Sequence, residues 1–567
     1  MNSTNKKDAK GQRPIFTRNA TGLVREISPH QAFIYNFMAI GLCTFTWVTL
    51  FSIAYSKNFL GANVGLAILL MALASIPFYL CTSMLSSAMP RSGGDYVWQS
   101  RVLHPSIGFA STFSAWTVWQ WYFASFLGVV ITAIGIQPYF ALLGNSNPAF
   151  ASLASNLAAA FGFNTSVFWI TSAVILLGFA IAAAGMRFYV RLQYLLFAGS
   201  AASALTILLV LATTSHAQFV ESFNRFTLPL VQSQGNQTLT SAVENSGGYY
   251  QYILNTANIG SASFSLVNTL LLFGVIWISF GYAFWSIYNL SEVKKADSFK
   301  IQAWIQVGSS LLFAMFLLAL WFLLESVVGL KFLESFYTLF YNQASATNPL
   351  AFFYTPYYPA IVASISSSQL VWALILIGLV FGIFQVILIV YFASTRIMLA
   401  SSIDRVLPEK VGYVNPRSHS PLIALIISAL GCEAFLYLII YDNNLTSYFS
   451  TAGLATQIAY VLICITAILF PFRNKAVFDA SPIAKYKVGG FPLLSILGIF
   501  ALIVNLYIAG IFVAGPPFTG VSVSSTQSII FVFGIFVACL LIYAIARTIR
   551  KKQGIELSLS FSEIPPE

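Results

Sequence analysis

The residues that could do chemistry lie in three short polar stretches between long apolar runs. Asp95 follows the pair Gly93-Gly94 in the stretch 90–109, and Glu292 precedes two lysines in 279–300. The third stretch, 393–421, contains Ser-Thr-Arg and then Asp-Arg-Val-Leu-Pro. None of the three has a phosphate-binding loop, a metal-ligand cluster or a nucleophile next to a base. We therefore do not expect an enzyme, and the paired glycines predict a tight turn.

The cysteines are spaced like small apolar side chains and not like a metal or redox motif. All five fall inside apolar runs: Cys43, Cys81, Cys432, Cys464 and Cys539. We expect neither disulfides nor zinc, and no cofactor. A channel is also disfavoured, because no ring of charges and no filter-like repeat marks a pore.

The elements that must position these stretches are membrane helices. Only 8% of the 567 residues are charged and 58% are hydrophobic, whereas a soluble chain carries roughly a quarter charged residues. Apolar runs of spanning length recur from Gln31 to Ala546. The sequence therefore predicts an all-α integral membrane protein with twelve transmembrane helices. They are expected near 31–55, 60–84, 107–137, 167–184, 194–213, 266–290, 303–324, 370–391, 422–441, 451–471, 493–513 and 529–546.

The basic residues predict the orientation of the chain. With twelve spans, 25 of the 28 lysines and arginines fall on the side of the N-terminus, and only Lys57, Arg225 and Lys331 fall on the other. Basic residues stay on the cytoplasmic side, so we expect a multi-pass protein of the cell membrane with cytoplasmic tails at 1–30 and 549–567 around a transmembrane domain at 31–548. The first 30 residues show no removable signal peptide. The net charge of +11 then follows from topology and needs no nucleic acid.

Two outward-facing segments, 215–264 and 333–369, are long and polar. Glycosylation sequons begin at Asn164, Asn236 and Asn444, all on the predicted outer side.

The three polar stretches resemble motifs of the amino acid-polyamine-organocation family of permeases. The chain has Pro90-x-Ser-Gly-Gly-x-Tyr96 after span two, Glu292-Val-Lys294 at the end of span six, and Ser394-x-Arg396 followed by Asp404-x-x-Leu-Pro408 after span eight. The resemblance implies a leucine-transporter-like fold, in which spans one to five (about 31–213) and six to ten (about 266–471) form an inverted repeat and helices eleven and twelve (about 493–546) are appended. It also implies that Asp95, Glu292, Arg396 and Asp404 belong to cytoplasmic loops and gates.

In that fold, spans one and six are interrupted halfway, and the exposed backbone binds the solute. Free N–H groups suit a carboxylate and free carbonyls suit an ammonium group. The resemblance places the substrate-binding residues at two segments: Ala39, Ile40, Gly41, Leu42, Cys43 and Thr44, and then Ser279, Phe280, Gly281, Tyr282 and Ala283. Close packing of helices through Gly41 and Gly281 is the alternative interpretation.

The sequence departs from the family at both interruptions. Gly41 stands alone where relatives have a glycine-rich motif, and Ala283 and Phe284 stand where many relatives carry an acidic residue. The second departure favours a solute with an apolar or aromatic side chain over a cationic one. Among the aromatic residues of spans three and six, we rank Tyr282 and Phe280 above Trp119 as solute contacts.

The coupling ion is undetermined between H⁺ and Na⁺. Ser394 and Thr395 at the end of span eight could give hydroxyl ligands to Na⁺, but such side chains also bond to the carbonyls of their own helix. Glu433 is the single carboxylate deep in a span, and a paired structural role is favoured over proton transport.

The sequence predicts a secondary transporter that moves amino acids or related small amines by alternating access. The alternative is a membrane receptor or sensor that keeps the permease fold without transport, which the lone Gly41 would fit. The expected partners are a small solute and the bilayer; the oligomeric state is not determined by the sequence.

Overall fold

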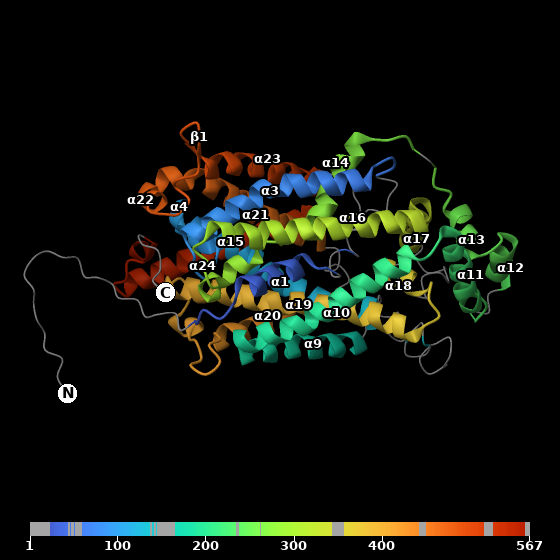
Figure 1. Ribbon diagram of the computed structural model, residues 1–567. Coiled ribbons are helices and arrows are strands. Elements are labelled where there is room, and N and C mark those ends of the chain that lie inside the picture. The colour runs from blue at the N-terminus through green and yellow to red at the C-terminus, as the bar shows by residue number, and fades with distance from the viewer. Residues whose placement is uncertain are drawn as a thin grey trace, which may run out of the picture.

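The protein is a bundle of long helices that run along one axis (Figure 1). The computed structural model describes residues 23–42, 46, 50, 59–136, 139–140, 143, 165–233, 237–260, 262–342, 357–441, 449–514 and 526–561. The end of the bundle that holds α4 (Asp95–Val102) is called the N-terminal face below. The end that holds α11 (His216–Ser233) is called the opposite face.

Ten helices among the described residues are long and apolar enough to cross a membrane. The all-α, multi-pass membrane class predicted from the sequence is therefore confirmed. The spanning helices are α3 (Val64–Ala88), α9 (Thr165–Ala184), α10 (Met186–Ala212), α14 (Leu266–Phe280) with η4 (Trp285–Glu292), α15 (Phe299–Ala303) with η5 (Trp304–Gly308) and α16 (Ser309–Val327), α19 (Gln369–Ile403), α20 (Leu422–Tyr441), α21 (Phe449–Arg473), α23 (Leu493–Ala514) and α24 (Thr526–Lys552).

The other two predicted spans are compatible with a twelve-helix topology. Span one begins with α1 (Pro29–Ile40), and beyond Leu42 only isolated residues of it are described. Span three is an unbroken helical run in which α-helical and π-helical turns alternate: α5 (Pro105–Phe113), η1 (Ser114–Val118), α6 (Trp119–Val130) and η2 (Ile131–Ile136). Such π-helical turns occur often at functional sites.

Short helices cover both ends of the bundle. On the opposite face, the two long polar segments fold into α11, α12 (Gln237–Asn245), α13 (Tyr249–Ala257), α17 (Leu330–Asn342) and α18 (Tyr358–Ala363). Toward the N-terminal face lie α4, η7 (Glu409–Gly412), α22 (Lys475–Asp479), η9 (Leu557–Phe561) and the antiparallel pair β1 (Lys487–Val488) and β2 (Phe491–Pro492). The sequon residues Asn164, Asn236 and Asn444 lie outside the described residues.

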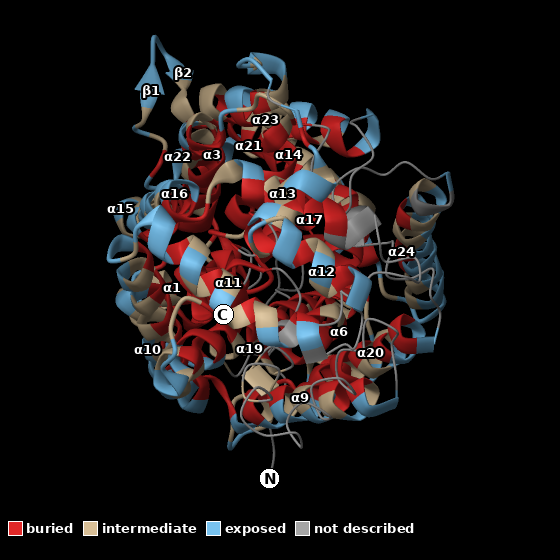
Figure 2. Ribbon diagram, turned by 90° about the vertical axis from the view of Figure 1, so that its right-hand side faces the viewer, coloured by how far each residue is buried: buried red, intermediate tan, exposed pale blue. Residues whose placement is uncertain are grey.

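The outer surface of the bundle is apolar. Figure 2 looks along the bundle and shows buried residues at its centre and exposed ones around its rim. Large apolar side chains such as Leu73, Trp169 and Leu209 are more than half exposed. Such a belt would be unfavourable in water and is suited to lipid.

Two predicted boundaries were wrong, because polar residues with partners in the protein lengthen the helices. Span eight was expected to end at 391, but α19 continues to Ile403. Its last turns carry Arg396, which is buried and paired with Glu292 and so does not need water to satisfy its charge. α10 begins at Met186 instead of 194, and its first turns carry Arg187, which is largely exposed and pairs with Glu26.

Small residues allow α10 and α19 to pack closely. The Ser200 hydroxyl donates to the Gly378 carbonyl at 3.1 Å, and the Ser203 hydroxyl donates to the Ile375 carbonyl at 2.7 Å. A Cβ atom on Gly378 would lie 2.4 Å from the Gly199 carbonyl oxygen. Contact through small residues is a common way for membrane helices to associate.

We expect Gly378→Ala to destabilise the bundle, because the added methyl group must push α10 and α19 apart. Overpacking of this kind costs about 1–3 kcal/mol, and it is measured as a lower midpoint of thermal unfolding in detergent. Gly510→Ala is the matched control, since Gly510 is also helical and has no atom within 4 Å of its added Cβ. Equal midpoints for the two variants would contradict the packing described.

Candidate functional site

The first helix of span one ends within the segment where the sequence predicts an interruption. Ser28 and Gln31 form a capping box at the start of α1, and the helix ends at Ile40. Gly41 follows with φ 80° and ψ 80°, a left-handed conformation that glycine adopts without steric cost. Ala39 and Ile40 lie in the last turn of α1, and Gly41 and Leu42 lie beyond it, all four buried. Cys43 and Thr44 lie outside the described residues.

Span six is interrupted within its predicted segment as well. Ser279 and Phe280 end α14, and residues 281–284 form turns before η4 continues as a 3₁₀-helix. The Gly281 carbonyl accepts a hydrogen bond from the Tyr460 hydroxyl at 2.7 Å. A Cβ atom on Gly281 would lie 2.9 Å from that hydroxyl oxygen, so the contact requires the small residue. Tyr282 and Ala283 lie within the turns.

The two interrupted helices are joined by side chains of α1. The backbone N–H of Ser286, in the first turn of η4, donates to Asn36 Oδ1 at 2.7 Å. The Asn289 side chain donates to the Tyr35 hydroxyl at 3.1 Å. Asn36 thus supplies a partner to an N–H group that the end of a helix leaves free.

Aromatic rings surround the interruption of span six. We call them the aromatic cluster; its members are Phe78, Trp116, Tyr282, Phe284, Trp285 and Tyr460. The Trp116 ring lies 5.4 Å from Tyr460 and 5.7 Å from Phe284 between centroids. The predicted contact Tyr282 belongs to the cluster, whereas Phe280 packs against Phe313 at 5.3 Å.

Ser394 and Thr395 bond to their own helix. Thr395 donates to the Tyr391 carbonyl at 2.7 Å, and Ser394 donates to the same carbonyl at 3.3 Å. Ser394 also shares a hydrogen bond of 3.1 Å with Ser428. These contacts fit the interpretation that the hydroxyls satisfy α19, and the sodium-site prediction stays a prediction. Glu433 accepts a hydrogen bond from Ser172 at 3.0 Å.

Two buried ion pairs hold the N-terminal face. The Arg396 guanidinium donates twice to Glu292, at 2.8 and 2.9 Å, and joins α19 to the end of η4. The Arg101 guanidinium donates twice to Asp404, at 2.6 and 2.8 Å, and joins α4 to the end of α19. Each pair has two parallel hydrogen bonds, the geometry that best offsets the desolvation of the charges.

Asp95 occupies the first position of α4, directly after Gly94. Its Oδ2 accepts hydrogen bonds from Gln99 at 3.0 Å and from the Trp116 indole at 3.1 Å. Burial raises the pKa of Asp95 to about 7, and the hydrogen bond from Trp116 and the nearby Tyr288 hydroxyl offset part of the increase. Asp95 therefore links the loop after span two to span three and to η4.

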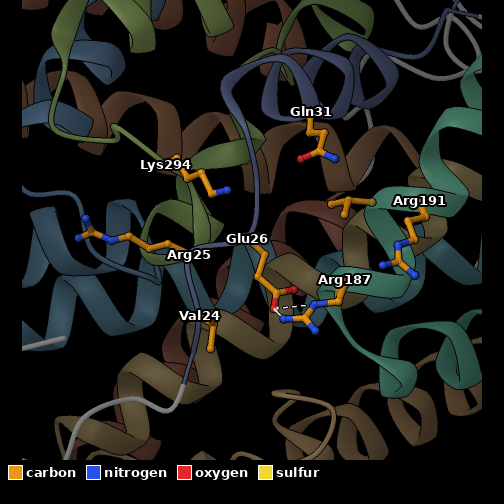
Figure 3. A pocket seen from close by; sticks show the side chains of 8 residues that line it. Val24, Arg25, Glu26, Gln31, Arg187, Arg191 and Lys294 are labelled. Carbon is orange, nitrogen blue, oxygen red and sulfur yellow. Dashed lines mark hydrogen bonds and ion pairs between the residues drawn. The ribbon is translucent and has the colours of Figure 1, made fainter.

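The segment before α1 crosses the same face. The Ile27 N–H donates to the Glu292 carbonyl at 2.8 Å, and the Lys294 N–H donates to the Ile27 carbonyl at 2.9 Å. Figure 3 shows Glu26 reaching Arg187, 2.6 Å away, beside a pocket of about 390 Å³. The pocket is lined by Val24, Arg25, Glu26, Gln31, Arg187, Val190, Arg191 and Lys294. The N-terminal face is thus closed by contacts between loops and helix ends.

The arrangement brings two helix ends and an aromatic cluster together inside the bundle. Polar contacts close the bundle at its N-terminal face. Among the described residues no group of three His, Cys, Asp or Glu side chains could hold a metal ion. The four described cysteines are free and buried.

Several residues of this site were missed in the sequence. Tyr460 gives no signal, because it is one tyrosine in an apolar span. Arg101 was counted only as a topology marker, although it forms a buried pair. Asn36 could have been found, since an amide in the middle of an apolar run needs a partner inside the protein.

Comparison with known proteins identifies the family. The sequence profile of a family described as amino acid permease matches residues 35–540, which is most of the chain. No curated protein matches the chain.

We expect Gly94→Ala to loosen the N-terminal face. Its Cβ would lie 2.6 Å from Ile287 Cγ1 of η4, and such overpacking costs about 1 kcal/mol or more, a factor of about 5 in an equilibrium. Ser291, buried at the end of η4, reports the change: in the variant, Ser291→Cys should react about fivefold faster with a maleimide. Gly489→Ala is the control, because Gly489 has a similar φ of 56° and no atom within 4 Å. Equal labelling rates would show that Gly94 does not hold η4 in place.

Proposed function

The chain belongs to the amino acid permease family, and on that premise we propose that it is a secondary active transporter that works by alternating access. The family consists of membrane transporters of amino acids or related compounds, so a transport role is favoured over an enzymatic one. We further propose that it lies in the cell membrane with the N-terminal face toward the cytoplasm. The distribution of basic residues supports this orientation: Arg91, Arg101 and Arg187 lie toward that face, and Arg225 and Lys331 toward the other.

The observation that carries the proposal is the interruption of two helices inside the bundle. A helix that ends at Ile40 or at Phe280 leaves carbonyl groups of its last turn without partners in the helix, and its end carries partial negative charge. An ammonium group fits such a position.

The aromatic cluster favours a neutral solute with an apolar or aromatic side chain. Its six rings offer faces and edges for packing, and none of its members is acidic. A cationic side chain would lack a carboxylate partner among them. We therefore expect leucine-like or phenylalanine-like compounds to be preferred over arginine or polyamines.

Alternating access requires that the closed N-terminal face can open. The contacts that close it join η4, α4 and the segment before α1 to one another and to the end of α19 through polar interactions. Contacts of this kind can break without disturbing the packed helices. The receptor hypothesis needs the same solute site but no opening, so transport assays separate the two.

We expect counterflow of labelled neutral amino acids into proteoliposomes, and a loss of at least about tenfold in Gly41→Trp, because the indole would fill the interruption of span one. Gly510→Trp is the control, since Gly510 lies on an exposed part of α23. A panel with cationic amino acids and polyamines tests selectivity.

Binding of a solute without counterflow would instead support the receptor. Uptake that is equal in Gly41→Trp and Gly510→Trp would show that the solute does not bind at the interruption. No uptake or binding of any compound would contradict the proposed function.

A further inference from the structure

Among the described residues, three carboxyl groups are buried at the N-terminal face, and two of them are paired with arginine. The paired groups are Glu292 and Asp404. Asp95 is as deeply buried, with 0% of its surface exposed, and no ion pair reaches it among the described residues. A buried carboxylate without a cation is costly, so such a group holds a proton more strongly than an exposed one does.

The groups that face Asp95 come from four elements and carry no positive charge. Gln99 of α4 and Trp116 of η1 donate hydrogen bonds to it. Tyr288 of η4 and Tyr460 of α21 interact electrostatically with the same carboxyl group. The nearest elements also carry charges that already neutralise each other in pairs: Arg101 with Asp404, and Arg396 with Glu292.

Asp95 is buried only while these elements stay together. The carboxyl group lies where α4, span three and the second half of span six meet. Gly94, the residue before it, packs directly on Ile287 of η4. A movement of η4 away from α4, which opening of this face requires, would bring water to the carboxyl group.

We propose that Asp95 is a proton-binding site of the transport cycle, protonated while η4 packs on α4 and ionised when this packing opens to the cytoplasm. The inference rests on the proposed transport function and deepens it by naming the proton as the coupling ion. On opening, the O–H bond of the carboxylic acid breaks, the proton passes to cytoplasmic water, and the carboxylate stays on the protein. One positive charge then crosses with each zwitterionic solute.

The direction of the pH effect follows from the burial. In the closed arrangement the pKa of Asp95 is about 7, against an ordinary value of 3.8 for a hydrated group. Closing the face therefore takes up a proton at any pH between these values. Closure is fully favoured below the lower value and weakens by about tenfold per pH unit as the pH rises to the upper one.

Tyrosine hydroxyls connect this proton to the predicted solute site. Tyr460 donates to the Gly281 carbonyl at the interruption of span six and interacts with Asp95 on its other side. Tyr288 lies against both Asp95 and Tyr460. The solute and the proton thus bind to parts of the same closed arrangement, so its opening releases both.

The test uses proteoliposomes of the full chain with a pH-sensitive dye trapped inside and a neutral amino acid that the counterflow panel identifies. In the wild-type protein we expect the amino acid to carry protons with it and an inward proton gradient to drive its accumulation. Exchange should fall by roughly tenfold or more as the pH on both sides rises from about 5 to about 8.

Asp95→Asn should lose the solute-driven proton flux, the gradient-driven accumulation and the pH dependence of exchange, because the amide cannot titrate. Asp297→Asn is the matched control, an exposed carboxylate in the loop after η4. Asp95→Glu keeps a titratable group and should retain proton flux with a shifted pH midpoint, which separates proton binding from a purely structural role.

Proton flux or gradient-driven accumulation that persists in Asp95→Asn would overturn the proposal. So would wild-type uptake that moves no protons or follows a sodium gradient instead, and either result would leave the transport function intact. A wild-type protein that neither binds nor exchanges any solute would overturn the transport function first, and this inference with it. If Asp95→Asn does not fold, the wild-type dye signal and the pH midpoint of Asp95→Glu test the proposal instead. A wild-type protein without proton flux, or an unshifted midpoint in Asp95→Glu, would overturn it.

Discussion

Backbone groups inside a lipid-facing bundle must find partners within the protein, and this constraint governs the architecture around both interruptions. A continuous helix satisfies it alone, whereas a helix that stops halfway does not. At span six the Tyr460 hydroxyl binds the Gly281 carbonyl, and Asn36 binds the Ser286 N–H where η4 starts. These side chains come from spans ten and one. The interruption is therefore stable only while three spans stay together.

The same constraint explains why the interruptions suit a solute. The helix ends at Ile40 and Phe280 are both carboxyl ends, which carry partial negative charge and leave carbonyl groups without partners in the helix. Tyr460 fills one such position at Gly281, and the aromatic cluster surrounds it without adding charge. On the proposed function, these carbonyl groups would bind the ammonium group of the solute, and the rings would contact its side chain.

Sequence patterns predicted the features that depend on composition and spacing. They missed the residues whose roles depend on contacts between distant parts of the chain. Apolar runs gave the membrane class and most spans, and the family motifs placed both interruptions, at Gly41 and Gly281. The length of α19 was wrong, because buried pairing of Arg396 lets a polar segment stay helical. Tyr460 and Arg101 act through partners more than 150 residues away in the chain, which no local pattern shows.

The buried carboxyl groups of the N-terminal face have different partners. Two of them pair with arginine, and Asp95 does not among the described residues. Glu292 and Asp404 each meet an arginine through two parallel hydrogen bonds, which offset the cost of burying these charges. Asp95 meets only neutral donors, so its charge depends on whether water reaches it. The paired groups join α4 and η4 to α19, and on our proposal the protonation of Asp95 would follow the opening and closing of this face.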